Sequence, residues 1–112
     1  MKPDTLEAML IERPVRRVLH LTLKRRWFDL IASGVKREEY REMKPYWHKR
    51  LSGRQFDAVH FRNGYSADAP AMLVELRNIG SGLGVLEWGA PMAQSVYILR
   101  LGVVLQAPPP AP

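Results

Sequence analysis

The sequence contains no cysteine. This absence excludes a disulfide framework, a thiolate nucleophile and a zinc site built from thiolates. The three histidines, His20, His48 and His60, do not have the spacing of a metal-binding motif. We therefore predict that the protein uses neither a metal ion nor another cofactor.

Long hydrophobic runs are also absent. No segment approaches the about 18 consecutive apolar residues that a membrane-spanning helix needs. The N-terminus carries Asp4, Glu7 and Glu12, where a secretory signal would have a basic and then an apolar segment. We expect a soluble, cytoplasmic protein with no membrane partner, and its length of 112 residues is that of one domain.

Acidic residues are scarce relative to basic ones in the first half of the chain. Residues 1–56 contain fourteen lysines and arginines against seven acidic residues, whereas residues 57–112 contain three against four. The net charge of +6 is therefore concentrated in the first half. This asymmetry is typical of a surface that meets nucleic acid, because neutralising phosphates releases counterions. A general contribution to solubility is the alternative explanation.

Capping residues and apolar spacing predict two or three short helices. Asp4 is a good N-cap for the first helix, which belongs to an N-terminal extension over residues 1–15. In the second helix, Trp27, Leu30 and Ile31 fall at the spacing of a core-facing stripe. The expected helices cover residues 4–12, 24–33 and 43–51.

Alternating or continuous apolar segments predict about five β-strands. In the first, Leu19, Leu21 and Leu23 alternate with polar residues, which include His20 on the solvent-facing side. The expected strands cover residues 18–24, 36–42, 56–61, 71–79 and 95–105. Because strands and helices do not alternate regularly, we predict a compact mixed β-barrel of the α+β class rather than a doubly wound sheet.

Two segments are expected to lie outside regular structure. Residues 80–84 are rich in glycine, but they lack the lysine and hydroxyl residues of a phosphate-binding loop, and no convincing helix follows them. We interpret them as a flexible turn. Residues 106–112 are almost only alanine and proline and are expected to form a disordered tail.

Residues 34–41, with the sequence Gly-Val-Lys-Arg-Glu-Glu-Tyr-Arg, bring opposite charges close together after the second helix. Lys36 and Arg41 can neutralise a phosphate or polarise a carbonyl, and Glu39 can orient the lysine or accept a base amino group. In a regular strand, Glu39 and Arg41 would face one way and Lys36 the other. We predict that Lys36 lies in the turn or on a bulge, so that all three form the wall of a ligand cleft. A solvated, charged edge strand is the alternative.

Three other segments supply candidate ligand-binding residues. A cation at Lys24 opposes the dipole of the helix that follows it, which would suit a bound anion. In residues 43–51, aromatic rings are mixed with cations, as in proteins that bind unstacked nucleic acid. We expect Trp47 to pack in the core and Tyr46 to line the cleft. The candidates from these segments and the Asn-Gly turn are Lys24, Lys44, Tyr46, Trp47, Arg62, Asn63, Tyr65 and Ser66.

Glu75 is a second carboxylate with a possible catalytic role. In the expected strand over residues 71–79, it lies on the face opposite the apolar side chains and beside Arg62. A surface ion pair with Arg62 or Arg77 is the alternative.

The residues quoted above resemble a known family. The Gly-x-Lys-x-x-Glu-x-Arg element of residues 34–41 follows a helix that ends Leu-Ile-Ala-Ser, and it precedes Lys-Pro-Tyr-Trp at 44–47 and Arg-Asn-Gly-Tyr at 62–65. In this order the chain is similar to the ASCH domain family over residues 16–105. The resemblance implies a PUA-like β-barrel with a cleft beside the motif, and a partner that is RNA or a modified nucleoside.

The resemblance also implies possible chemistry. Some ASCH proteins are amidohydrolases that remove acyl groups from N4-acetylcytidine, and others are linked to ribonuclease activity. The amidohydrolases use the motif lysine, a threonine three residues later and a glutamate further along. Lys36 matches the lysine, Glu39 stands in place of the threonine, and Glu75 or Glu87 is the candidate for the later glutamate.

Three functional hypotheses follow. The first is a binding module whose cleft accepts a nucleobase on a tyrosine and holds phosphates with lysine and arginine. The second is an amidohydrolase acting on N4-acylcytidines, with Lys36, Glu39 and Glu75 as its catalytic residues. The third is an interaction protein that binds a protein partner through its N-terminal helix and its alanine- and proline-rich tail.

Overall fold

The computed structural model describes residues 15–110, so the expected helix over residues 4–12 lies outside the described part. Five strands, two α-helices and one turn of 3-10 helix make up this part of the chain. The number and type of elements confirm the predicted α+β class. In chain order, the elements are β1 (Val18–Leu23), α2 (Arg25–Ala32), β2 (Glu38–Glu42), α3 (Pro45–Leu51), β3 (Ala58–Asn63), β4 (Ala71–Gly82), η1 (Leu86–Trp88) and β5 (Val96–Gln106).

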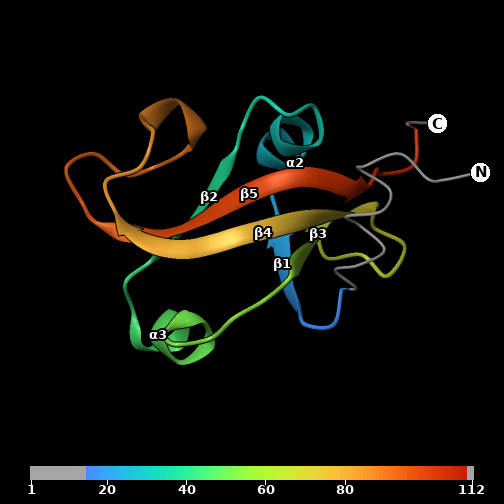
Figure 1. Cartoon of the computed structure of the whole chain (residues 1–112). Coiled ribbons are helices and arrows are strands. Elements are labelled where there is room, and N and C mark those ends of the chain that lie inside the picture. Colours follow the sequence, from blue (N-terminus) through green and yellow to red (C-terminus); the bar gives the residue numbers. More distant parts are fainter. Residues whose placement is uncertain (1–14, 111–112) are drawn as a thin grey trace, which may run out of the picture.

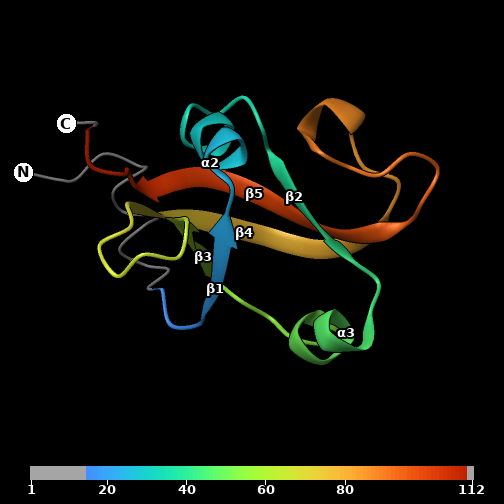
Figure 2. The ribbon, with the colours of Figure 1, turned by 180° about the vertical axis from the view of Figure 1, so that it is seen from behind.

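The strands form one mixed sheet in the order β1-β3-β4-β5-β2. β1 and β3 are parallel, whereas the other neighbours are antiparallel. Figures 1 and 2 show the long strands β4 and β5 side by side, with β1 crossing them and with α2 and α3 on opposite sides of the pair. The sheet therefore curls into a half-barrel whose edge strands, β1 and β2, are not joined by a ladder.

The hydrophobic core fills the inside of this half-barrel. The predicted inward faces of β1, β3 and β4 are confirmed, because successive side chains of a strand point to opposite sides of the sheet. Phe28 and Ile31 of α2 and Leu51 of α3 cover the core at its ends. The buried strand residues of the core are Leu19, Leu21, Leu23, Val59, Phe61, Met72, Val74, Leu76, Tyr97, Leu99 and Leu101.

The predicted core stripe of α2 is partly wrong. Phe28, not Trp27, is the fully buried aromatic residue of this helix, and Trp27 is half-buried beside Gly89. The apolar residues of this short helix occupy neighbouring positions around its axis, so spacing alone cannot decide which ring faces the core. This rotation places the Trp27 indole next to the candidate site.

The expected flexible turn at residues 80–84 is also wrong in its first half, because β4 continues through Gly82 and pairs with β5. Gly80 is accommodated for a steric reason. A Cβ at this position would lie 2.2 Å from the guanidinium of Arg100, which crosses the strand to bond the side-chain oxygen of Asn78. Glycine at position 80 therefore lets the Arg100 side chain lie directly against the backbone of β4.

The C-terminal boundary shifts by one residue, since Gln106 pairs with Leu73 as the last residue of β5. Residues 107–110 have no regular secondary structure. Within residues 15–110, no helix is long and apolar enough to cross a membrane.

Candidate functional site

A cleft of about 540 Å³ lies between β1 and β2, the two edges of the curled sheet. Its walls come from the end of β1, the start of α2, β2, the end of β3 with the loop after it, and the end of η1 with the glycine that follows. The volume falls within the range of pockets that hold small molecules. The lining residues are Thr22, Leu23, Lys24, Arg25, Trp27, Glu39, Tyr40, Arg41, Asn63, Gly64, Tyr65, Trp88 and Gly89.

Lys36 lies in the turn between α2 and β2, as predicted, and not in the strand. Gly34, with a φ of +83°, ends α2 in a left-handed conformation that favours glycine. The backbone N–H of Lys36 then bonds the carbonyl oxygen of Leu30. This local geometry turns the lysine inward, where only 2% of the residue is exposed.

The Lys36 amine is surrounded by polar and aromatic groups beneath the cleft. It donates to the backbone oxygen of Trp88 and lies 3.2 Å from Glu39 Oε1. Its nitrogen is 5.0 Å from the ring centroid of Trp27 and 4.7 Å from that of Tyr40. Burial lowers the pKa of Lys36, although the adjacent Glu39 carboxylate acts in the opposite direction.

Glu39 joins two cations. Its second carboxylate oxygen, Oε2, lies 2.6 Å from Nη2 of Arg41, and the residue is only 6% exposed. The three side chains therefore form a triad, Lys36–Glu39–Arg41, in which Lys36 and Glu39 are buried and Arg41 is partly buried. The triad has one positive charge in excess when the lysine is protonated. Such an excess in a poorly solvated site favours an anionic or electron-rich ligand.

Arg41 connects the two open edges of the sheet. Its Nη2 donates to the backbone oxygen of Thr22 in β1 at 3.3 Å, while Arg41 itself belongs to β2. Its Nε is buried and has no hydrogen-bond partner within the described residues. A buried donor without a partner costs about 1–3 kcal/mol, so an acceptor that reached it would be bound favourably.

The segment between β4 and β5 covers Lys36. The Tyr40 hydroxyl accepts a bond from the Val85 N–H at 2.9 Å and donates to Glu38 at 2.7 Å. A Cβ on Gly84 would lie 2.5 Å from the Tyr40 ring, and one on Gly89 would lie 2.9 Å from Trp27. The two glycines therefore let the backbone pack directly on the rings that surround the lysine amine.

Five of the other predicted ligand residues lie at this cleft or support it. Lys24 and Asn63 line the wall, and Tyr65 lies at the rim with 89% of its surface exposed. Arg62 does not line the cleft. Its Nη2 donates to the backbone oxygen of Ser66, so this pair fixes the loop that carries Asn63 and Tyr65.

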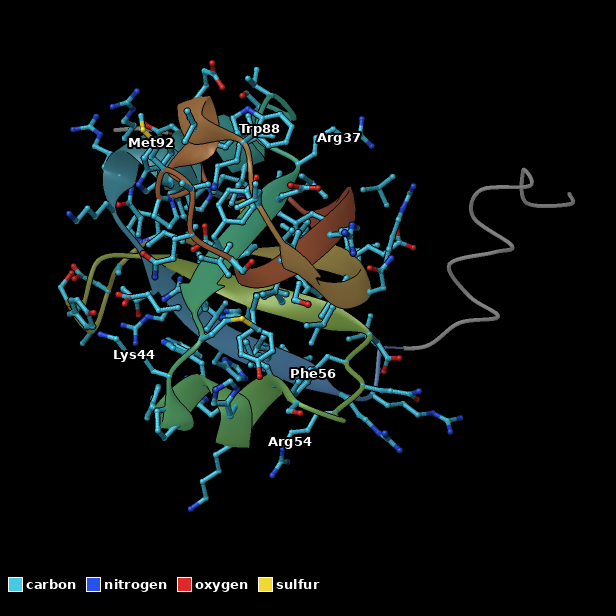
Figure 3. All side chains as sticks on the ribbon, turned by 90° about the vertical axis from the view of Figure 1, so that its left-hand side faces the viewer. Arg37, Lys44, Arg54, Phe56, Trp88 and Met92 are labelled. Atoms are coloured by element: carbon cyan, nitrogen blue, oxygen red, sulfur yellow. The ribbon has the colours of Figure 1, made fainter. Side chains whose placement is uncertain are left out.

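Three predicted residues lie elsewhere. Lys44 is exposed and pairs with Glu42 at 3.1 Å, and Figure 3 shows it beside α3 and far from Trp88. Trp47 packs against the core as predicted. Tyr46 is 62% exposed on α3 and does not line the cleft, contrary to expectation. The position of α3 depends on long-range contacts, such as the bond between His48 and the Tyr97 hydroxyl, which a local pattern does not reveal.

Glu75 is not brought to Lys36 and Glu39. It lines a second cavity of about 1090 Å³ between the α3–β3 connection and strands β4 and β5. Its Oε1 lies 3.5 Å from Arg77 Nε and accepts the Val103 N–H at 3.3 Å, where the register of β4 and β5 is irregular. Although this cavity is larger, its carboxylate Glu75 pairs locally with Arg77, and the buried charges Lys36 and Glu39 lie at the smaller cleft.

Among the charged and aromatic residues that line the cleft, sequence reasoning missed four: Arg25, Trp27, Tyr40 and Trp88. Tyr40 could have been identified, because it lies between Glu39 and Arg41 in the segment that was singled out. Trp88 could not, because its carbonyl reaches Lys36 from 52 residues further along the chain.

No group of three or more histidines or acidic residues that could hold a metal ion occurs in the described part of the chain. Comparison of the sequence and structure with models of protein families, with curated proteins and with solved structures finds no match. Function must therefore be inferred from the residues of the chain itself.

Proposed function

We propose that this protein binds RNA or a modified nucleoside, with a nucleobase in the cleft and phosphate at its basic rim. The observation that carries this proposal is the Lys36–Glu39–Arg41 triad under a cleft whose walls are rich in aromatic rings. A triad with an excess positive charge attracts an anion, and the exposed ring of Tyr65 offers a flat surface on which a base can stack.

The charges at the rim agree with such a ligand. Lys24 and Arg25 lie where β1 gives way to α2, and Glu39 is the one carboxylate among the lining residues, with both of its oxygens already paired. Lysine and arginine at the mouth of a cleft can contact phosphate oxygens without reading the base. The Asn63 side chain has both a donor and an acceptor, which suits contact with a base edge.

The aromatic groups provide a stacking surface. Tyr65 is nearly fully exposed, so its ring is available to a ligand, and Trp27, Tyr40 and Trp88 also line the cleft. Stacking of one base on one aromatic side chain is worth about 1–3 kcal/mol. An exposed ring beside fixed cations is typical of sites for single-stranded or unstacked bases.

The resemblance to the ASCH domain supports the same assignment. The residues that carry it, Gly34, Lys36, Glu39 and Arg41, build the turn and the floor of the cleft. We therefore propose that the curled sheet is a PUA-like half-barrel and that this cleft is its ligand site.

The first test is binding of a labelled single-stranded RNA, measured by fluorescence anisotropy. Tyr65→Ala should weaken binding about fivefold to 150-fold, because it removes one stacking surface. Met92→Ala is the matched control, since Met92 is also exposed, at 78%, but lies outside the cleft. Equal affinities of wild type and Tyr65→Ala would contradict the proposed site.

Hydrolysis of N4-acylcytidine is a second candidate, favoured by the contact between Glu39 and a lysine whose pKa is lowered by burial. In this reaction, water adds to the acyl carbonyl carbon, Lys36 stabilises the oxyanion, and the C–N bond breaks as the amine takes a proton. Glu39 would have to leave one of its two cations in order to accept the proton from water.

Release of cytidine from N4-acetylcytidine tests this candidate. An amidohydrolase should release cytidine over time, and Glu39→Gln should stop the release because an amide cannot act as a base. Full turnover by Glu39→Gln would exclude Glu39 as the base. The absence of release from the wild type, together with RNA binding, would leave the cleft as a binding site.

A further inference from the structure

Two aromatic rings of α3 are connected to the cleft by direct contacts. The guanidinium of Arg41, which lines the cleft, lies 5.0 Å from the ring centroid of Trp47. The Trp47 ring in turn meets the Tyr46 ring edge to face, with their centroids 4.8 Å apart and their planes at 85°. Only one ring therefore separates a cleft residue from the exposed Tyr46.

Arg50 fixes this arrangement. Its guanidinium lies 5.2 Å from the Trp47 ring and 5.5 Å from the Tyr46 ring, and Nη1 bonds the Tyr46 hydroxyl at 3.2 Å. Its other terminal nitrogen donates to the backbone oxygen of His20 in β1 at 3.1 Å. Tyr46 is thus 62% exposed but anchored, so a ligand that stacks on it loses little additional side-chain entropy.

The charge around Tyr46 suits a polyanion. The segment from Lys44 to Arg50 contains three lysines and arginines and no acidic residue. Among the described residues, neither Lys49 nor Arg50 has a carboxylate within salt-bridge distance, and Lys44 contacts only the exposed Glu42. Cations at the C-terminal end of α3 also interact favourably with the helix dipole. The dipole explains the cations but not the exposed Tyr46 ring beside them.

We propose that Tyr46 and Arg50 form a second base subsite, so that the ligand of this protein is a single-stranded nucleic acid of at least two nucleotides. This inference rests on the proposed function of the cleft. One base occupies the cleft, and the strand passes the Arg41–Trp47 contact so that the next base stacks on Tyr46. Lys44 and Lys49 then hold the phosphates of the strand, because unstacked strands are bound by rings and cations together. A free nucleoside would leave this subsite empty.

The test compares uridine monophosphate with oligouridylates of increasing length, by titration calorimetry on the full chain. The wild type should bind the dinucleotide about fivefold to 150-fold more tightly than the mononucleotide. Tyr46→Ala should abolish this gain and leave the mononucleotide affinity unchanged. Tyr46→Phe should keep the gain, because the phenyl ring still presents a stacking face.

The outcomes separate the two proposals. The proposed subsite is wrong if Tyr46→Ala binds the oligonucleotides with wild-type affinity, or if the wild type binds the oligonucleotides no more tightly than the mononucleotide. Neither result would contradict the proposed binding site in the cleft. If Tyr65→Ala and Tyr46→Ala both leave all affinities unchanged, or if the wild type binds neither form, the cleft proposal fails as well. Circular dichroism of each variant checks that the fold is retained.

Discussion

The cleft and the larger cavity each have one strand glutamate in their wall, but the two carboxylates have different surroundings. Glu39 in the cleft is 6% exposed and lies between two cations, one on each oxygen. Glu75 in the larger cavity is half-buried and accepts a backbone N–H of β5. Burying the charges of the triad costs desolvation free energy, and a fold can be held together without that cost. Glu75 instead accepts a backbone N–H that the irregular pairing of β4 and β5 leaves without a strand partner. The buried charges thus lie at the smaller of the two cavities.

The comparison predicts different costs when each carboxylate is neutralised. Glu39→Gln leaves the buried Lys36 and the partly buried Arg41 without the carboxylate that pairs them, so it should lower the free energy of unfolding by about 3–5 kcal/mol. Glu75→Gln should cost about 1 kcal/mol, because its partners reach solvent. Urea unfolding followed by circular dichroism measures both values. The double variant Lys36→Met/Glu39→Gln should recover part of the loss, and equal costs for the two single variants would contradict the distinction.

The second prediction concerns the structural role of Glu75. A Cβ on Gly102 would lie 1.7 Å from Glu75 Oε1, so Gly102→Ala must displace the carboxylate. We expect a loss of about 1 kcal/mol in the free energy of unfolding, because the flexible Glu75 side chain can move but loses its hydrogen bond to the Val103 N–H. The loss should shrink in a Glu75→Ala background, where the space is empty, and a double-mutant cycle measures the difference. An identical cost in both backgrounds would show that Glu75 does not occupy this space.

The third prediction compares one cation from each cavity. Lys24→Ala should reduce the slope of the logarithm of RNA affinity against the logarithm of salt concentration by about 0.7, the value for one phosphate contact in a single strand. Arg77→Ala, in the wall of the larger cavity, should leave the slope unchanged. Anisotropy titrations at several salt concentrations provide both slopes. A larger change in the slope for Arg77→Ala than for Lys24→Ala would indicate that RNA binds at the other cavity.

The smallest expected effect is the pH dependence of Lys36. Burial lowers its pKa, so between this lowered pKa and the ordinary value of about 10.4 the unfolded chain binds more protons than the folded one. Stability contributed by Lys36 therefore increases as the pH rises through this window. The free energy of unfolding of the wild type should rise relative to that of Lys36→Met. Burial raises the pKa of Tyr40 and acts oppositely at alkaline pH, but both proteins contain Tyr40, so its effect cancels. A constant difference across the window would contradict a lowered pKa.

Local geometry explains what the sequence could predict. The convergence of Lys36, Glu39 and Arg41 depends on a glycine that ends a helix and on the alternation of a short strand, and both are visible in eight consecutive residues. The strand alternation likewise predicted which side chains of β1, β3 and β4 face the core. These features follow from the backbone within a few residues of each side chain.

Long-range packing explains what the sequence could not predict. The Trp88 carbonyl accepts a hydrogen bond from Lys36, and it belongs to the segment between β4 and β5. The position of this segment depends on the long pairing of these two strands, which continues to Gly82 and Val96. The position of Tyr46 depends on how α3 is anchored to β1 and β5, through Arg50 and His48. Glu75 satisfied the sequence criteria for a cleft carboxylate, but the curl of the sheet places it in the wall of the other cavity.

The most direct test of the account is the change in backbone amide chemical shifts when single-stranded RNA is added to the isotope-labelled protein. We predict that the perturbed amides belong to the cleft, among them Lys24, Gly64 and Tyr65, with further changes in α3 when the strand exceeds one nucleotide. Perturbations confined to the larger cavity, around Arg54 and Ser81, would contradict this prediction.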